Sequence, residues 1–118
     1  MSTHSTLGVK MEDGSIMGCY VHYDGDTMYE RIEQYLSCRT TTDLTMLIAK
    51  AQLSGGIRSF HSTSLYSDVP ATDFLSDSEP YAIDEVSFYE NHGGTYAWYL
   101  VDYKTGNIEK RLMYYDDN

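Results

Sequence analysis

Basic residues are scarce in this 118-residue chain, which has 8 Lys and Arg against 18 Asp and Glu and a formal net charge of −10 at pH 7. Proteins that bind DNA, RNA or anionic membrane surfaces gain much of their affinity from Lys and Arg, so the composition argues against these partners. Cysteine is scarce too. Cys19 and Cys38 form no C-x-x-C pair, and two thiols are too few for a disulfide scaffold.

Long apolar runs are also missing. No stretch approaches the roughly 20 residues of a membrane span, and the first residues lack the basic and apolar regions of a secretory signal. We therefore expect a protein of the reducing cytoplasm. At 42% hydrophobic residues the chain has enough apolar material for a core, and its length fits a single domain, residues 1–118.

The first part of the chain predicts a β-hairpin. Apolar residues alternate over 7–11, Asp13-Gly14 follows, and strand-forming residues recur over 16–23. Asp-Gly between two alternating segments is a strong hairpin signal, because Gly adopts positive φ without steric cost. Gly18 within the second strand predicts a bulge or a close approach.

Two helices are expected next. A T-x-x-E capping box begins at Thr27, and apolar residues at helical spacing predict a helix over 28–37. Residues 40–43 supply a second N-cap, which is followed by an apolar stripe with helical period over 44–51. Gly55-Gly56 is the expected C-terminal stop of this second helix.

The remaining chain predicts three further strands, over 81–89, 95–103 and 108–115, the last two joined as a hairpin through 104–107. Residues 54–80 have no clear period, so they form either a functional loop or a loop that contains a short strand near 57–61. The resulting order is β-β-α-α-loop-β-β-β. It indicates an α+β fold in which an antiparallel sheet carries two helices packed on one face.

One candidate binding site lies at the end of the second strand. Tyr20, His22 and Asp24 occupy alternate positions, so we expect their side chains on one side of the strand. Such a polar trio is typical of a pocket or an exposed binding surface. The alternative, that His22 and Asp24 only hold the turn by hydrogen bonds, stays open. The intervening residues are expected to face the core: Cys19, Val21 and Tyr23.

Motifs of catalysis are missing from the sequence. Asp24-Gly25-Asp26 has the residue types of an oxygen-ligand site for a hard cation, but ordinary turn chemistry accounts for it. Cys19 has no neighbouring cation that would activate its thiol, so it is interpreted as a small hydrophobic residue. The sequence predicts no catalytic residue, no metal and no cofactor, and therefore a protein that is not an enzyme.

A second candidate site is an acidic stretch. No Lys or Arg occurs between Arg58 and Lys104, and unbroken acidity of this length attracts a basic partner. The alternative is a solvated loop that only maintains solubility. The stretch has four aromatic residues as candidate buried anchors of an interface: Phe74, Tyr81, Phe88 and Tyr89. Its candidate binding residues are seven carboxylates: Asp68, Asp73, Asp77, Glu79, Asp84, Glu85 and Glu90.

The hairpin also has a recognisable motif. The pattern D-G-x-I-x-G-x-Y-x-H-x-D-G over 13–25 resembles small proteins of unassigned function that are encoded in bacteriophage genomes. Those proteins combine such a hairpin with helices and a Tyr-rich closing hairpin, and TYAWYLVDYKTGNIEKRLMYY has the same character. The resemblance implies an origin and a fold, and it implies no reaction.

These observations lead to two functional hypotheses. The first is a small acidic phage-type protein in the host cytoplasm that binds and modulates or inhibits a basic host protein, such as a nucleic-acid-binding or defence protein, by acidic mimicry. The second is a small-molecule-binding module that uses His22, Asp24 and the tyrosines of the sheet. Neither hypothesis involves direct nucleic-acid or membrane binding, and self-association is left open.

Overall fold

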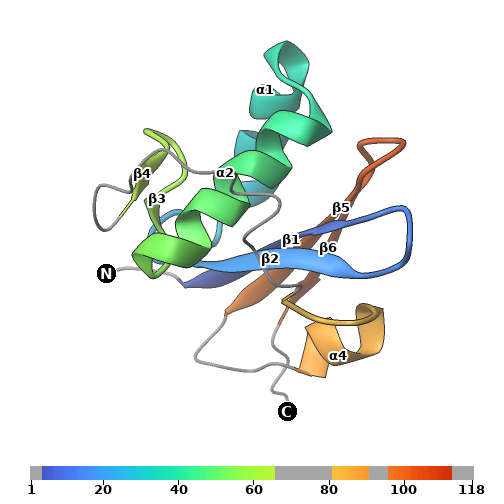
Figure 1. Ribbon diagram of the computed structural model, residues 1–118. Helices are drawn as coiled ribbons and strands as arrows, with labels where there is room; N and C mark the ends of the chain where they lie inside the picture. Colours follow the sequence, from blue (N-terminus) through green and yellow to red (C-terminus); the bar gives the residue numbers. More distant parts are fainter. Residues whose placement is uncertain (1–3, 66–80, 91–95, 113–118) are drawn as a thin grey trace.

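The computed structural model describes residues 4–65, 81–90 and 96–112. These residues form one six-stranded sheet in the order β4-β3-β2-β1-β5-β6. Figure 1 shows α1 and α2 on one side of this sheet and α4 on the other. The elements are β1 (Ser5–Lys10), β2 (Ile16–Val21), α1 (Met28–Cys38), α2 (Thr41–Ser54), β3 (Ile57–Ser59), β4 (Ser64–Leu65), α4 (Glu85–Glu90), β5 (Ala97–Asp102) and β6 (Ile108–Leu112).

The predicted first hairpin is confirmed. β1 and β2 pair antiparallel with Gly8 opposite Gly18. In the turn between them Gly14 has φ +90°, and the Asp13 carboxylate accepts a hydrogen bond from the Ser15 backbone N–H at 2.9 Å. The short strand expected near 57–61 is present as β3.

The expectation of a purely antiparallel sheet is wrong, although the α+β class is confirmed. β1 pairs parallel with β5, and β2 pairs parallel with β3. Parallel neighbours need a crossover connection. The α1–α2 pair supplies that connection between β2 and β3, so the helices both cover the sheet and set the direction of the next strand.

The second helix has the predicted ends, whereas the first does not have the predicted cap. Thr40 and Asp43 form a reciprocal capping box at the start of α2, and Gly55 ends the helix with φ +98°. At the start of α1 the Thr27 side chain makes no capping bond. Its hydroxyl instead donates to the Asp24 carbonyl and accepts a bond from Arg31 Nε at 3.1 Å.

The main core lies between the sheet and the α1–α2 pair. It is mostly aliphatic, which follows from the apolar stripes of the two helices and the alternation of the strands. Its largest fully buried members come from all of these elements: Leu7, Val9, Val21, Met28, Ile32, Leu44, Ile48, Ile57, Tyr99 and Val101.

The opposite face of the sheet corrects the prediction of a strand over 81–89. The backbones of Tyr81 and Ala82 bond to Ile16 of β2, with a single β-bridge at Ala82, and residues 85–90 form α4. Asp84 begins this helix, because its carboxylate accepts a hydrogen bond from the Ser87 backbone N–H at 2.9 Å. The structure therefore has the two expected helices on one face of the sheet and a third helix on the other face.

Two glycines provide the space for this third helix. A Cβ atom on Gly8 would lie 2.7 Å from the ring of Phe88, and one on Gly18 would lie 3.0 Å from the ring of Tyr81. Phe88 is fully buried in a second, smaller cluster with Ile16, Ala82, Tyr89, Trp98 and Leu100. The close approach expected at Gly18 is thus confirmed, and the approaching group is the aromatic side chain of Tyr81.

Candidate functional site

The trio predicted at the end of β2 belongs to two neighbouring groups. The Tyr20 hydroxyl and His22 Nδ1 lie 2.6 Å apart, and the ring of His4 stacks on His22 with centroids 4.6 Å apart. Cys19 and Val21 face the core as expected. Tyr23 does not, because it is 40% exposed and its ring packs edge-on against His22.

Asp24 turns toward other elements. Its Oδ2 accepts hydrogen bonds from the Ser59 hydroxyl at 3.1 Å and the His61 backbone N–H at 3.4 Å, and Oδ1 lies 3.7 Å from Arg31 Nε. The residue has φ 71°, where the chain leaves the sheet. These contacts connect the turn before α1 to the end of β3. They support the structural interpretation of Asp24 that the sequence left open.

Two further candidate chemistries concern metal ligands and thiols. Within residues 4–65, 81–90 and 96–112, no three His, Cys, Asp or Glu side chains are grouped to hold a metal ion. Burial raises the pKa of the Cys19 thiol to about 12, so the thiol stays protonated at neutral pH. Cys38 is an exposed free thiol.

The acidic stretch is described only over its C-terminal part. Asp68, Asp73, Asp77, Glu79 and the aromatic Phe74 lie outside the described residues. The other three carboxylates belong to α4 and its cap. Asp84 caps the helix, Glu85 forms a 2.7 Å ion pair with Lys10, and Glu90 is exposed.

The aromatic residues of this part do not act as exposed anchors. Phe88 and Tyr89 are buried in the second core, and Tyr81 is half-buried over Gly18. The Tyr89 hydroxyl donates to Glu109 Oε1 at 2.6 Å, and the Arg111 guanidinium lies 3.7 Å from the centre of its ring. These aromatic side chains attach α4 to the sheet.

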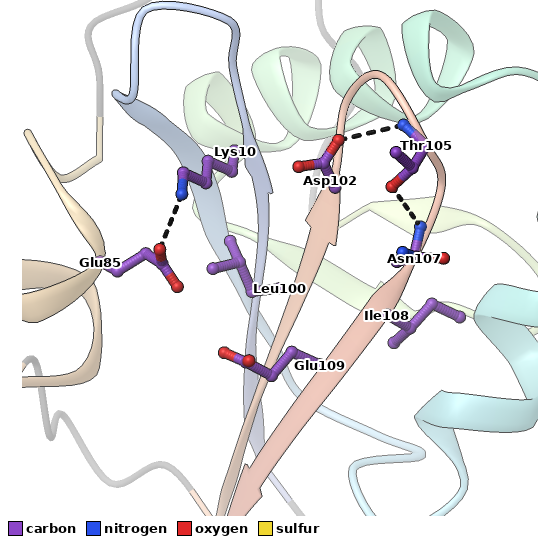
Figure 2. A pocket seen from close by; sticks show the side chains of 8 residues that line it. All are labelled: Lys10, Glu85, Leu100, Asp102, Thr105, Asn107, Ile108 and Glu109. Carbon is purple, nitrogen blue, oxygen red and sulfur yellow. Dashed lines mark hydrogen bonds and ion pairs between the residues drawn. The ribbon is translucent and has the colours of Figure 1, made fainter.

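Beside α4 the structure has an acidic pocket of about 370 Å³ (Figure 2). Its carboxylates come from three elements: Glu85 of α4, Asp102 at the end of β5 and Glu109 of β6. Lys10 is its one lysine or arginine among the described residues, so the lining has a formal excess of negative charge. Figure 2 shows Leu100 between the Lys10–Glu85 pair and Glu109.

Hydrogen bonds fix the charges of this acidic pocket. Backbone N–H groups of Thr105 and Lys104 donate to the Asp102 carboxylate at 3.0 and 2.9 Å, and they lower the pKa of that carboxyl. The hydrogen bond and charge of Glu85 raise the pKa of Lys10. At neutral pH Asp102 and Lys10 are therefore ionised.

Three charged residues of the acidic pocket were not among the residues predicted from sequence: Lys10, Asp102 and Glu109. Their meeting depends on the register of β5, in which Asp102 lies beside Lys10 of β1 and Leu100 lies opposite Glu109 of β6. The turn from Asp102 to Ile108 can be recognised in the sequence and predicts the antiparallel pairing of β5 with β6. No local sequence pattern predicts the parallel pairing of β5 with β1.

Comparisons with protein-family models, with curated proteins and with solved structures found no significant match. The resemblance to phage-encoded proteins therefore stays a prediction. Among the described residues no helix combines the length and the apolar composition needed to cross a membrane.

Proposed function

We propose that this chain is a non-enzymatic binding protein for a basic protein partner, and that its acidic pocket receives a Lys or Arg side chain of that partner. The observation that carries the proposal is the convergence of Glu85, Asp102 and Glu109 around a cavity of about 370 Å³. The strongly acidic composition favours the same class of partner.

The lining suits a long cationic side chain. The apolar side chain of Leu100 lies among the carboxylates and would contact the aliphatic part of Lys or Arg. The ion pair between Lys10 and Glu85 already places one ammonium group against a carboxylate of the acidic pocket. An arginine of the partner would also use its planar donor geometry at Asp102 or Glu109.

The charged side chains of the acidic pocket are partly exposed to solvent, and this exposure limits how much each one contributes to the binding free energy. The side chains of Lys10 and Glu85 are 38% and 41% exposed. Exposed pairs add little affinity individually, but a field of one sign accelerates association and selects partners. Complex formation should therefore slow steeply as salt is added.

In the phage context that the hairpin motif implies, the partner would be a basic host protein in the host cytoplasm. A partner that itself binds nucleic acid would fit, because carboxylates would then occupy its phosphate-binding groove. The alternative, a small-molecule module built on His22 and Asp24, has less support, since the Asp24 carboxylate contacts Ser59, His61 and Arg31.

The test is a titration with a short arginine-rich peptide, followed by amide chemical shifts. We expect shifts at 102–109 and at Glu85, and weaker binding at higher salt. The double variant Asp102→Asn/Glu109→Gln keeps hydrogen-bond acceptors for the turn and for Tyr89 while it removes two charges. It should lower the affinity by about tenfold or more.

The matched control is Asp26→Asn/Glu30→Gln, which removes two exposed charges elsewhere. Equal losses in both double variants would mean that only net charge matters, and they would contradict the pocket. A pull-down from host lysate with the same proteins then asks for a partner. A protein that the acidic-pocket variant fails to retain, and that DNA displaces, would support mimicry. Absence of any such protein would count against the proposed function.

A further inference from the structure

A second pocket has the opposite electrostatic character. It has a volume of about 310 Å³ and lies between α1 and the turn from β3 to β4. Arg31 and Arg39 line it, and no carboxylate of the described residues does. In a chain with a net charge of −10, two of the eight Lys and Arg residues gather at one small cavity. We call this cavity the arginine pocket.

The helix wall of the arginine pocket follows from helical spacing. Arg31, Gln34, Tyr35 and Cys38 are three, four and seven residues apart, which places them on one side of α1. Arg39 caps the helix, with its backbone N–H bonded to the Tyr35 carbonyl at 3.0 Å. The guanidinium of Arg39 lies 5.4 Å from the centre of the Tyr35 ring.

The opposite wall is the turn after β3, residues 60–63. The Thr63 backbone N–H donates to the Phe60 carbonyl at 3.0 Å, and Thr63 has φ 51°. The Phe60 ring is buried and packs against the Tyr35 ring with centroids 5.5 Å apart. The two rings give the pocket an aromatic side, while Ser62 and Thr63 add hydroxyl groups to its rim.

Hydrogen bonds hold the Arg31 side chain at the wall of the arginine pocket. Arg31 Nη1 lies 2.6 Å from His61 Nδ1. A guanidinium only donates, so His61 Nδ1 accepts and the proton of the neutral ring is on Nε2. The Arg31 Nε also donates to Thr27, which holds the side chain in place. Within the described part of the chain, the Arg39 guanidinium makes no hydrogen bond or ion pair, so its five N–H groups face solvent or a ligand.

Two carboxylates lie just outside the arginine pocket. Asp24 Oδ1 is 3.7 Å from Arg31 Nε, and the pKa of Asp43 is lowered mainly by hydrogen bonds from Thr40 and to a smaller extent by the charge of Arg39. They partly offset the two arginines, but neither makes a hydrogen bond to Arg39. The cation that is available for a ligand is therefore Arg39, while Arg31 and His61 line the same pocket and are bonded to each other.

From this geometry we propose that the arginine pocket binds a small planar organic anion, a carboxylate or phosphate monoester on an aromatic body. The acidic group lies at Arg39, whose planar donors match carboxylate and phosphate oxygens. The aromatic body lies along Tyr35 and the edge of Phe60. The volume is at the lower end for ligand pockets, which limits the ligand to a small molecule. This site is independent of the acidic pocket and of the partner proposed for it.

The experiment measures binding of phenyl phosphate and benzoate by calorimetry and by amide shifts. We expect shifts at 38–39 and 60–63, and at least one of the two probes to bind. Arg39→Gln should weaken that binding by about tenfold or more, because a charge-assisted hydrogen bond is lost. Arg39→Lys keeps the charge without the planar donors, so it should bind with intermediate affinity.

Lys104→Gln is the control, because it removes one exposed positive charge from the β5–β6 turn without changing a residue that lines the arginine pocket. An equal loss in Arg39→Gln and Lys104→Gln, or no binding of either probe, would overturn the proposal. Inorganic phosphate that binds as tightly as phenyl phosphate would contradict the proposed aromatic body of the ligand. Benzylamine that binds more tightly than benzoate and phenyl phosphate would contradict the proposed negative charge of the ligand. The acidic-pocket variant Asp102→Asn/Glu109→Gln should bind the anion like the wild type, so the two proposals fail separately.

Discussion

The two faces of the sheet are covered in different ways. On one face α1 and α2 bury an aliphatic core, and α2 has a reciprocal capping box and a glycine stop. On the other face the six-residue α4 buries a small, mainly aromatic cluster that fits over two glycines. The first face is stabilised by the large apolar area that it buries. The second depends on how well a few aromatic rings pack against the sheet. The acidic pocket opens beside the second, thinner cover.

This contrast predicts different local stabilities for the two faces. A short helix that buries few side chains undergoes local opening at a lower free energy than a central core does. The single tryptophan of the chain, Trp98, lies in the aromatic cluster and contacts Tyr89. Its fluorescence therefore reports on the α4 face, whereas far-UV circular dichroism is dominated by α1 and α2.

The largest effect is expected in the aliphatic core. Ile48→Ala removes a fully buried side chain of α2 and should lower the free energy of unfolding by about 2–5 kcal/mol. Urea unfolding followed by dichroism and by Trp98 fluorescence measures this change, and both signals should shift together. Met46→Ala on the exposed side of α2 is the control. Similar midpoints for the two variants would contradict this description of the core.

A smaller effect, of opposite sign to that expected from backbone entropy, should follow Gly8→Ala. The entropy term alone would stabilise the strand by about 0.5–1 kcal/mol. The new Cβ would lie 2.7 Å from both Phe88 and Ile16, so we expect a net loss of about 1–3 kcal/mol and a changed Trp98 spectrum. In the Phe88→Leu background the penalty should shrink. A stabilised Gly8→Ala protein would show that α4 does not lie against this glycine.

The smallest effect is expected on the stability of the protein at acidic pH. Hydrogen bonds from Ser87 lower the pKa of Asp84 in the folded protein. This contribution to stability is therefore present above the unfolded pKa of about 3.9 and is lost as the pH falls through the lower folded value. Between about pH 5 and pH 2 the Trp98 signal should change less steeply in Asp84→Asn than in the wild type. Glu12→Gln, an exposed carboxylate in the β1–β2 turn, should leave the wild-type slope unchanged.

The parts of the fold that could be predicted from sequence are those with local signals. The Asp13-Gly14 turn, the Thr40 cap and the Gly55 stop each specify one backbone conformation. The strand predicted over 81–89 was wrong because Val86, Phe88 and Tyr89 have high β-propensity. Asp84 as a helix cap outweighed that propensity once Gly8 and Gly18 offered a place to bury the aromatic rings.

The candidate sites could be predicted less well, because they depend on long-range pairing. Alternation correctly placed Tyr20 and His22 together, but the positive φ of Asp24 directs its carboxylate to Ser59. The acidic pocket needs the parallel pairing of β1 with β5, and the arginine pocket needs the turn after β3 to lie against α1. Neither arrangement has a signature in the neighbouring residues.

The position of β1 also determines when the sheet can be completed during synthesis. β1 lies between β2 and β5, and Ser5 pairs with Ala97. The hairpin of β1 and β2 can form early, whereas the other edge of β1 stays unpaired until the ribosome has released residues 97–102. Over that interval the open edge can pair with strands of other chains. Slow translation of the second half would therefore prolong the exposure of an aggregation-prone nascent chain.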